Sequence, residues 1–75
     1  MTTTQVVAIA FDSEVLAAAA YDAEHSMLQL DFRNGSLYCY FDVPPRLWEA
    51  LIAADSKGIF FHRAIRGHFR HLRLK

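Results

Sequence analysis

The sequence predicts an α+β domain in which a small antiparallel sheet of three to four strands is followed by two short helices packed on one face. The junction lies at Pro44 and Pro45, because a proline has no amide to donate to a sheet ladder yet fits the first turn of a helix. Apolar residues alternate before this junction and follow helical spacing after it. No internal repeat or second domain interrupts the pattern, so we expect residues 1–75 to form one domain.

The first half of the chain contains the predicted strands. Residues 6–11 are apolar and partly β-branched and predict a short strand, whereas residues 1–5 are polar, so that 1–10 is expected to be a frayed or edge-strand N-terminus. The run 15–21 contains four alanines, which favour a helix, but it is short and lacks a polar face, and we interpret it as a strand. Residues 27–32 alternate cleanly and predict a half-buried strand.

The turn at Asn34-Gly35 leads into a returning strand over residues 37–41, and the length of the turn decides which side chains enter the core. An odd loop, with Gly35 as a bulge, turns Tyr38 and Tyr40 into the core. An even loop places three apolar side chains there instead: Leu37, Cys39 and Phe41. Considered alone, the residues slightly favour the even loop.

Two helices are predicted after the junction. Apolar side chains at helical spacing indicate a first helix over residues 45–54. Ser56 is a good N-cap for a second helix from residue 57 to about residue 66, and Gly67 is a natural stop. The remaining residues, 68–75, are expected to be extended, as a strand-like tail or a loose arm.

Charge is divided unevenly along the chain. All eight acidic residues lie at or before Asp55, together with only two of the eight basic residues. Residues 56–75 contain no acid but hold six lysines and arginines and three histidines. Such a split indicates either an anionic partner or neutralisation of the basic segment by the acidic body, and the sequence favours neither.

A series of residues follows the order of a known family: Tyr21-Asp22, Leu28-x-Leu30-x-Phe32, Gly35, Tyr38-x-Tyr40, Val43-Pro44, Trp48, Ser56-Lys57-Gly58, Phe60-Phe61 and Ile65-Arg66. From about Phe11 to Leu74 the chain resembles the KTSC domain, which is named for the C-terminal extension of some lysyl-tRNA synthetases and also occurs as a small free-standing bacterial protein. The sequence departs from the family at His62, where asparagine is usual, and in its alanine-rich strand.

The resemblance implies a single KTSC-like domain with the α+β fold, and the association with a synthetase suggests RNA binding. In this family the residue between the two tyrosines is often charged. A charged residue there favours the odd loop, in which the rings of Tyr38 and Tyr40 are mainly structural.

The basic segment supplies the candidate nucleic-acid-binding residues: Lys57, Arg63, Arg66, Arg70 and Arg73. If the second helix continued past Gly67, Arg63, Arg66 and Arg70 would lie within about 60° of one another. Phe60 and Phe61 would lie on the other side of that helix. A basic helix face can bind phosphates, so RNA or tRNA is the expected partner. Tyr38 and Tyr40 are possible stacking residues.

No catalytic, cofactor or metal site is predicted. Cys39 lies in the middle of a strand without an adjacent base or helix N-terminus to activate it. His62, His68 and His71 have no carboxylate or cysteine near them in sequence to complete a rigid metal site. We therefore expect a protein that is not an enzyme. A single cysteine and the absence of a secretory signal or a membrane-length apolar run predict a cytoplasmic location.

A protein-interaction or homodimerisation module is the alternative hypothesis. With the odd loop, Leu37, Cys39 and Phe41 share the uncovered face of the sheet with Gln29 and Asp31. An exposed apolar patch of this kind usually has a partner.

Overall fold

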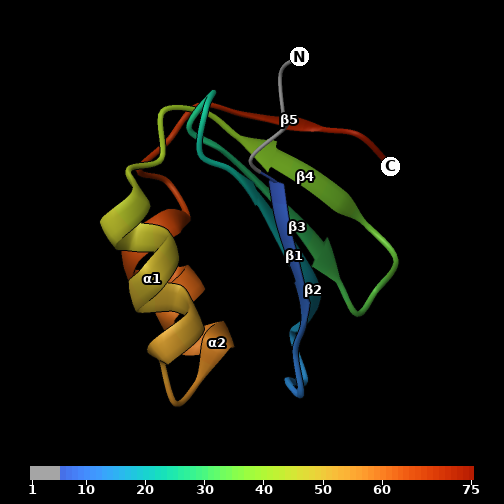
Figure 1. Cartoon of the computed structure of the whole chain (residues 1–75). Helices are drawn as coiled ribbons and strands as arrows, with labels where there is room; N and C mark the ends of the chain where they lie inside the picture. Colours follow the sequence, from blue (N-terminus) through green and yellow to red (C-terminus); the bar gives the residue numbers. More distant parts are fainter. Residues whose placement is uncertain (1–5) are drawn as a thin grey trace.

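The computed structural model describes residues 6–75, which form an antiparallel sheet with short helices on one face (Figure 1). The strands lie in sequence order across the sheet: β1 (Val6–Ala10), β2 (Leu16–Asp22), β3 (Met27–Phe32), β4 (Leu37–Tyr40) and β5 (His71–Arg73). The helical elements come between β4 and β5: α1 (Pro45–Ala53), α2 (Lys57–Phe60) and the π-helical turn η1 (Phe61–Ile65). The α+β class is confirmed, and the expectation for residues 1–5 falls outside the described residues.

Within residues 6–75 the sheet has five strands rather than the three to four predicted, because the C-terminal segment pairs with β4. The Leu74 amide donates to the Leu37 carbonyl at 2.7 Å, and the Phe41 amide donates to the Arg70 carbonyl at 3.0 Å. These bonds satisfy the outer backbone groups of β4, which would otherwise form an open edge. The tail is therefore strand-like and not a loose arm. The strand expected near residues 6–11 forms the opposite edge as β1.

The turn between β3 and β4 has the odd length. The Phe32 amide donates to the Ser36 carbonyl at 2.9 Å, and the Gly35 amide donates to the Phe32 carbonyl at 2.9 Å. Gly35 has a φ of +93°, which a residue with a side chain adopts only under strain. Tyr38 and Tyr40 therefore share the helix-covered face with the buried leucines of β3, as the odd loop requires.

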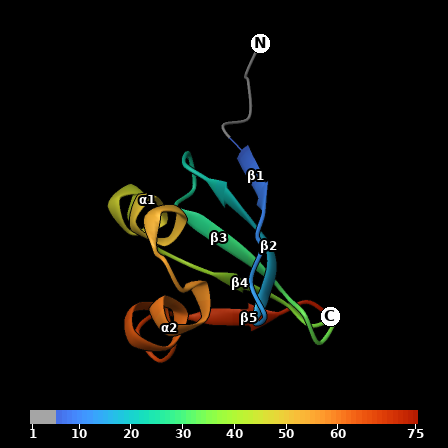
Figure 2. The same cartoon turned by 90° about the horizontal axis from the view of Figure 1, so that it is seen from below.

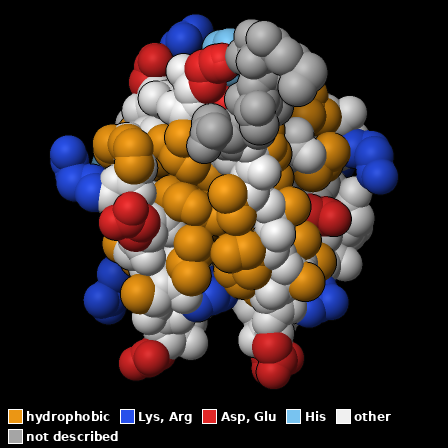
Figure 3. Space-filling view, in the orientation of Figure 1, with side chains coloured by type: hydrophobic (Ala, Val, Ile, Leu, Met, Phe, Trp, Pro, Cys, Tyr) orange, Lys and Arg blue, Asp and Glu red, His pale blue; other side chains and the backbone are white. Residues whose placement is uncertain are grey.

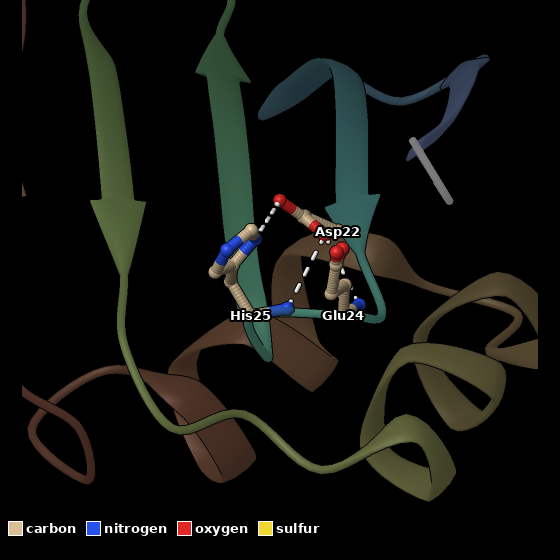
Figure 4. A network of polar contacts seen from close by, with 3 residues as sticks. All are labelled: Asp22, Glu24 and His25. Carbon is tan, nitrogen blue, oxygen red and sulfur yellow. Dashed lines mark hydrogen bonds and ion pairs between the residues drawn. The ribbon is translucent and has the colours of Figure 1, made fainter. Parts of the chain in front are cut away.

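A network of polar contacts holds the turn between β2 and β3 (Figure 4). One Asp22 carboxylate oxygen accepts from the amides of Glu24 and His25, at 3.1 and 3.3 Å, and the other lies 2.8 Å from His25 Nδ1. This side-chain hydrogen bond lowers the pKa of Asp22 and raises the pKa of His25. The Ser26 carbonyl accepts from the Val43 amide at 2.9 Å, which ties the turn to the segment before α1.

The helix α1 closes one end of the covered face. Its Trp48 stacks on Tyr21 of β2 with ring centroids 5.5 Å apart and an interplanar angle of 13°. The Tyr21 hydroxyl donates to the Val43 carbonyl at 2.6 Å. Leu51 from α1 is fully buried beside these rings. We call Tyr21, Val43, Trp48 and Leu51 the closed end.

The joint between α1 and α2 is fixed by two capping interactions. Ser56 Oγ accepts from the Ile59 amide at 3.2 Å, so the predicted N-cap is confirmed. Lys57 Nζ donates to the Ile52 and Ala54 carbonyls at 2.7 and 2.6 Å and thereby caps the C-terminal end of α1. Of the helices in residues 6–75, none has the length and apolar character needed to cross a membrane.

Candidate functional site

A pocket of about 340 Å³ lies between the helical layer and the β3–β4–β5 side of the covered face. In Figure 2, α1 lies beside β3, whereas the helical segment that follows lies towards β5. The pocket is found on the side of this second segment. We call it the aromatic pocket, and it is lined by Phe32, Asn34, Ser36, Tyr38, Tyr40, Phe61, Arg66, Gly67 and His71.

Five rings form the wall of the aromatic pocket. Tyr38 and Tyr40 stack at a centroid distance of 6.3 Å, as expected of alternate residues on one strand face. Phe61 meets the rings of Phe32 and Tyr40 edge-on at 5.1 and 6.1 Å. The His71 ring lies 5.5 Å from Tyr40 and 5.8 Å from Tyr38. Tyr40 is buried, whereas Tyr38 and Phe32 are half-buried and offer ring surface to the pocket.

The π-helical turn η1 brings Arg66 to the aromatic pocket. The Arg66 amide donates to the Phe61 carbonyl at 2.8 Å, five residues back. In an α-helix, residues five apart project about 140° from one another. The wider π turn closes one turn over that span and brings them onto the same side. The prediction that Arg66 lies on the side away from Phe61 is therefore wrong, because both line the aromatic pocket.

Several polar groups around the pocket are free to donate hydrogen bonds. Asn34 Oδ1 accepts from the Ser36 amide at 2.9 Å and from Ser36 Oγ at 2.6 Å, so its Nδ2 donors have no partner within residues 6–75. The Tyr38 and Tyr40 hydroxyls make no hydrogen bond within this range either. His71 Nδ1 lies 3.4 Å from the Phe69 carbonyl, an arrangement that leaves Nε2 as an acceptor when the ring is neutral.

The pKa of Tyr40 reflects the same surroundings. Burial, with a smaller contribution from Tyr38, raises it to about 12, and the nearby Arg66 acts in the opposite direction. An ordinary tyrosine has a pKa of about 10. The Tyr40 hydroxyl is therefore neutral at physiological pH and can donate a hydrogen bond.

Neither Arg66 nor Arg73 pairs with an aspartate or glutamate among residues 6–75, and Arg73 Nε donates to the Lys75 backbone oxygen at 2.9 Å. Arg73 lies with its guanidinium carbon 5.8 Å from the centroid of the Tyr38 ring, and Arg66 lies 3.4 Å from His62 Nδ1. Only Arg70 makes an ion pair, at 3.5 Å from Asp42, and this pair is highly exposed. Neutralisation by the acidic body therefore involves one arginine of the basic segment in the described part of the chain.

The remaining predicted site residues lie elsewhere. The ammonium of Lys57 is occupied by the carbonyls of α1 and lines a separate pocket. The second helix ends at Ile65, and Gly67 has a φ of +80°, so Arg70 leaves the helix face and stacks on Phe41 at 5.2 Å. Arg63 is exposed on η1. The structure thus brings together Tyr38, Tyr40, Arg66 and Arg73 but not the full basic set.

Sequence reasoning did not identify the other lining residues as part of a site: Phe32, Asn34, Ser36, Phe61, Gly67 and His71. Two signals could have found some of them. The first is that Asn34 lies in the tight turn that leads into the strand of Tyr38. The second is that a strand-like tail would place His71 and Arg73, two residues apart, on the same face. The π turn has no comparable signal in the sequence.

The uncovered face differs from the expectation at Cys39. It pairs with Gln29 and Leu72 in neighbouring strands and is only 8% exposed, and burial raises the pKa of its thiol. Leu37 and Phe41 are half-buried. The more exposed apolar side chain near Cys39 is Leu72, its cross-strand partner on the edge strand β5.

Comparison with known proteins gives a consistent result. Residues 12–69 match the sequence pattern of the KTSC domain. An uncharacterised protein from Stutzerimonas stutzeri is 37% identical over 67 residues, which cover 88% of this chain and 94% of that protein. A lysine–tRNA ligase from a Nostoc species is 38% identical over 63 residues, which cover 84% of this chain but only 11% of the ligase. The crystal structure of a KTSC domain protein from Yersinia pestis superposes with a TM-score of 0.87 and 31% identity, over 93% of this chain and 99% of that one.

Proposed function

This chain belongs to the KTSC domain family, and from that premise we propose that it is a small, non-catalytic accessory domain that binds RNA. The observation that carries the proposal is that Arg66 lines the aromatic pocket and Arg73 lies over its Tyr38 ring, while neither pairs with an aspartate or glutamate among residues 6–75. Guanidinium groups bind phosphates, and aromatic rings stack on unpaired bases. The two features together suit a single-stranded or looped RNA better than a duplex, in which the bases are already stacked.

The similarity to lysine–tRNA ligases supports the same proposal. The matched segment makes up 11% of one such ligase, which is the proportion expected of an appended domain rather than a catalytic core. A protein that consists mostly of this domain could bring the same binding surface to RNA on its own. In this proposal Arg63, Arg66, Arg70 and Arg73 contact phosphates, whereas Lys57 serves the fold.

The test is a salt titration with tRNA and with single-stranded RNA. Four phosphate contacts predict a slope of about −3 for log K against log salt with single-stranded RNA. Replacing both Arg63 and Arg66 with glutamine should flatten the slope by about one unit or more and weaken all sequences alike. Arg46→Gln is the matched control, because Arg46 is an exposed arginine on α1 in the acidic part of the chain.

The expected stability change in the double variant is small, within about 0.5 kcal/mol, because both side chains are exposed. No binding of either RNA at low salt would overturn the proposal. So would a double variant that binds normally but melts at a much lower temperature, since the arginines would then serve the fold.

Homodimerisation is the second candidate, and the outer edge of β1 favours it. The strand Val6–Ala10 contains no charge, proline or bulge, which are the usual devices that keep a sheet edge from pairing. Val7 is 51% exposed there, and Figure 3 shows hydrophobic side chains gathered between the helical layer and β1. Two copies could pair antiparallel through this edge about a twofold axis.

Sedimentation at high protein concentration tests this second candidate. A dimer that Ala8→Lys dissociates would support pairing through β1, because Ala8 is exposed at the centre of the strand. A protein that stays monomeric would exclude it. Leu72→Lys, on the opposite edge strand, is the control that should leave a β1 dimer intact.

A further inference from the structure

We infer that the aromatic pocket receives one unpaired base of the bound RNA and prefers uracil to cytosine, which carries an amino group where uracil carries a carbonyl. The inference rests on the proposed RNA binding and deepens it, because phosphate contacts alone do not distinguish bases. It depends on the size of the pocket, on its ring surfaces and on the free donors that Asn34 and Arg66 present to it.

The volume is sufficient for a single base. Pockets for small ligands measure roughly 300–1,000 Å³, and the aromatic pocket, at about 340 Å³, lies near the lower limit. The half-buried rings of Tyr38 and Phe32 offer the surface on which a base can lie. Because the two rings meet edge-on at a centroid distance of 5.7 Å, they form a corner rather than a slot for two stacked bases.

The position of Arg66 suits the phosphate of the same nucleotide. It lines the pocket beside Phe61 and is exposed, so a strand that passes the pocket mouth can reach its guanidinium. Arg73 approaches Tyr38 from the neighbouring strand β5. A base placed beside Tyr38 would thus lie near two guanidinium groups that can bind the adjoining phosphates.

The donors around the pocket set the preference. Asn34 Nδ2 has no partner within residues 6–75, since the two Ser36 groups fix Oδ1 as the acceptor of the carboxamide. Arg66 supplies only donors, and the hydroxyls of Tyr38 and Tyr40 can donate as well. The acceptors in the lining are Ser36 Oγ, whose hydrogen is donated to Asn34, the tyrosine hydroxyl oxygens, and His71 Nε2 when the ring is neutral. A base that lies against Asn34 Nδ2 and Arg66 would pair a carbonyl with these donors, whereas an exocyclic amino group at the same place would meet further donors.

Oligouridylate and oligocytidylate of equal length form the test pair, because uracil carries a carbonyl where cytosine carries an amino group. We expect the wild-type protein to bind oligouridylate about threefold to tenfold more tightly at one fixed salt concentration, the range that a single hydrogen bond supplies. Fluorescence anisotropy of labelled oligonucleotides measures both dissociation constants, and their ratio is the quantity compared.

Asn34→Asp is the decisive variant. It keeps the acceptor that the Ser36 amide and hydroxyl use and replaces the free donor with an acceptor. The added negative charge weakens the binding of both oligonucleotides, but this effect cancels in the ratio of their dissociation constants. We expect the preference for oligouridylate to be lost or reversed in Asn34→Asp. It should be retained in Gln29→Glu, the matched amide-to-carboxylate control on the uncovered face.

Three outcomes contradict the inference, and they are distinguishable. Equal binding of the two oligonucleotides by the wild-type protein, or a ratio unchanged in Asn34→Asp, would overturn base selection by this pocket while leaving phosphate binding intact. A ratio altered equally by Gln29→Glu would place the cause outside the pocket. The absence of binding to any RNA at low salt would overturn the proposed function, and the inference with it.

Discussion

The two ends of the covered sheet face both contain stacked tyrosine rings but differ in how closely they are packed. At the closed end, Trp48 stacks on Tyr21 and the Tyr21 hydroxyl donates to the Val43 carbonyl. At the aromatic pocket, Tyr38 and Tyr40 stack on each other and their hydroxyls have no partner within residues 6–75. A regular helix covers the first end, while a short π turn covers the second. The tyrosine under α1 therefore has a hydrogen-bond partner for its hydroxyl, whereas the two tyrosines near η1 have none within residues 6–75.

The largest expected effect tests the closed end. Trp48→Ala should destabilise the protein by about 3–5 kcal/mol, because the indole is buried against Tyr21 and its removal leaves a cavity. Tyr38→Ala is the matched change at the aromatic pocket and should cost less, since that ring is only half-buried. Chemical denaturation of the two variants measures the difference. Equal losses of unfolding free energy in the two variants would mean that both ends are packed equally closely, which would contradict the difference described above.

The next effect concerns how the helical layer is attached near β2. A Cβ at Gly58 would come within 2.8 Å of Val15 Cγ2, so Gly58→Ala requires the helix or the stiff valine to move. We expect a destabilisation of about 1–3 kcal/mol. In the double variant with Val15→Ala this cost should largely disappear, since the clashing methyl groups are gone. A double-mutant cycle that shows simple additivity would contradict the close contact.

Much of this arrangement could be predicted from the sequence, because its causes are local. The double proline, the Ser56 cap and the alternation of β3 each act through neighbouring residues, and all three predictions are confirmed. The fifth strand could not be fixed, because three residues of tail gain their stability only from pairing with β4. The site was predicted in part: Tyr38, Tyr40, Arg66 and Arg73 converge, but an assumed α-helix put Arg66 on the wrong side of Phe61.

A smaller effect should appear in the pH dependence of stability at the turn that holds Val43. The hydrogen bond with Asp22 raises the pKa of His25. Protonated His25 therefore contributes fully to stability below the ordinary histidine pKa of about 6.5, and this contribution is lost as the pH rises through the raised pKa. The same contact lowers the pKa of Asp22, so that contribution is lost as the pH falls through the lowered value. The pair therefore stabilises the folded protein most at pH values between the pKa of Asp22 and the pKa of His25.

His25→Gln should reduce the loss of melting temperature between mildly acidic and mildly alkaline pH. His68→Gln, at an exposed histidine without a carboxylate partner in residues 6–75, should leave that loss unchanged. If His25→Gln left the pH dependence of the melting temperature unchanged, the contact with Asp22 would not persist in solution. The turn near Val43 would then have no pH-dependent stabilisation from this pair, although the packing of the closed end would be unaffected.

The smallest effect tests whether Arg66 reaches the aromatic pocket at all, and it requires no RNA. Burial raises the pKa of Tyr40 to about 12, and Arg66 opposes this rise. Arg66→Gln should therefore raise the pKa further, whereas Arg63→Gln, on an exposed part of η1, should not alter it. The ultraviolet absorbance of the phenolate gives the titration, and Tyr40→Phe identifies the late-titrating group. An unchanged pKa of Tyr40 in Arg66→Gln would mean that the guanidinium points away from the pocket. The closed end and the aromatic pocket would then differ in how closely they are packed but not in the presence of a nearby positive charge.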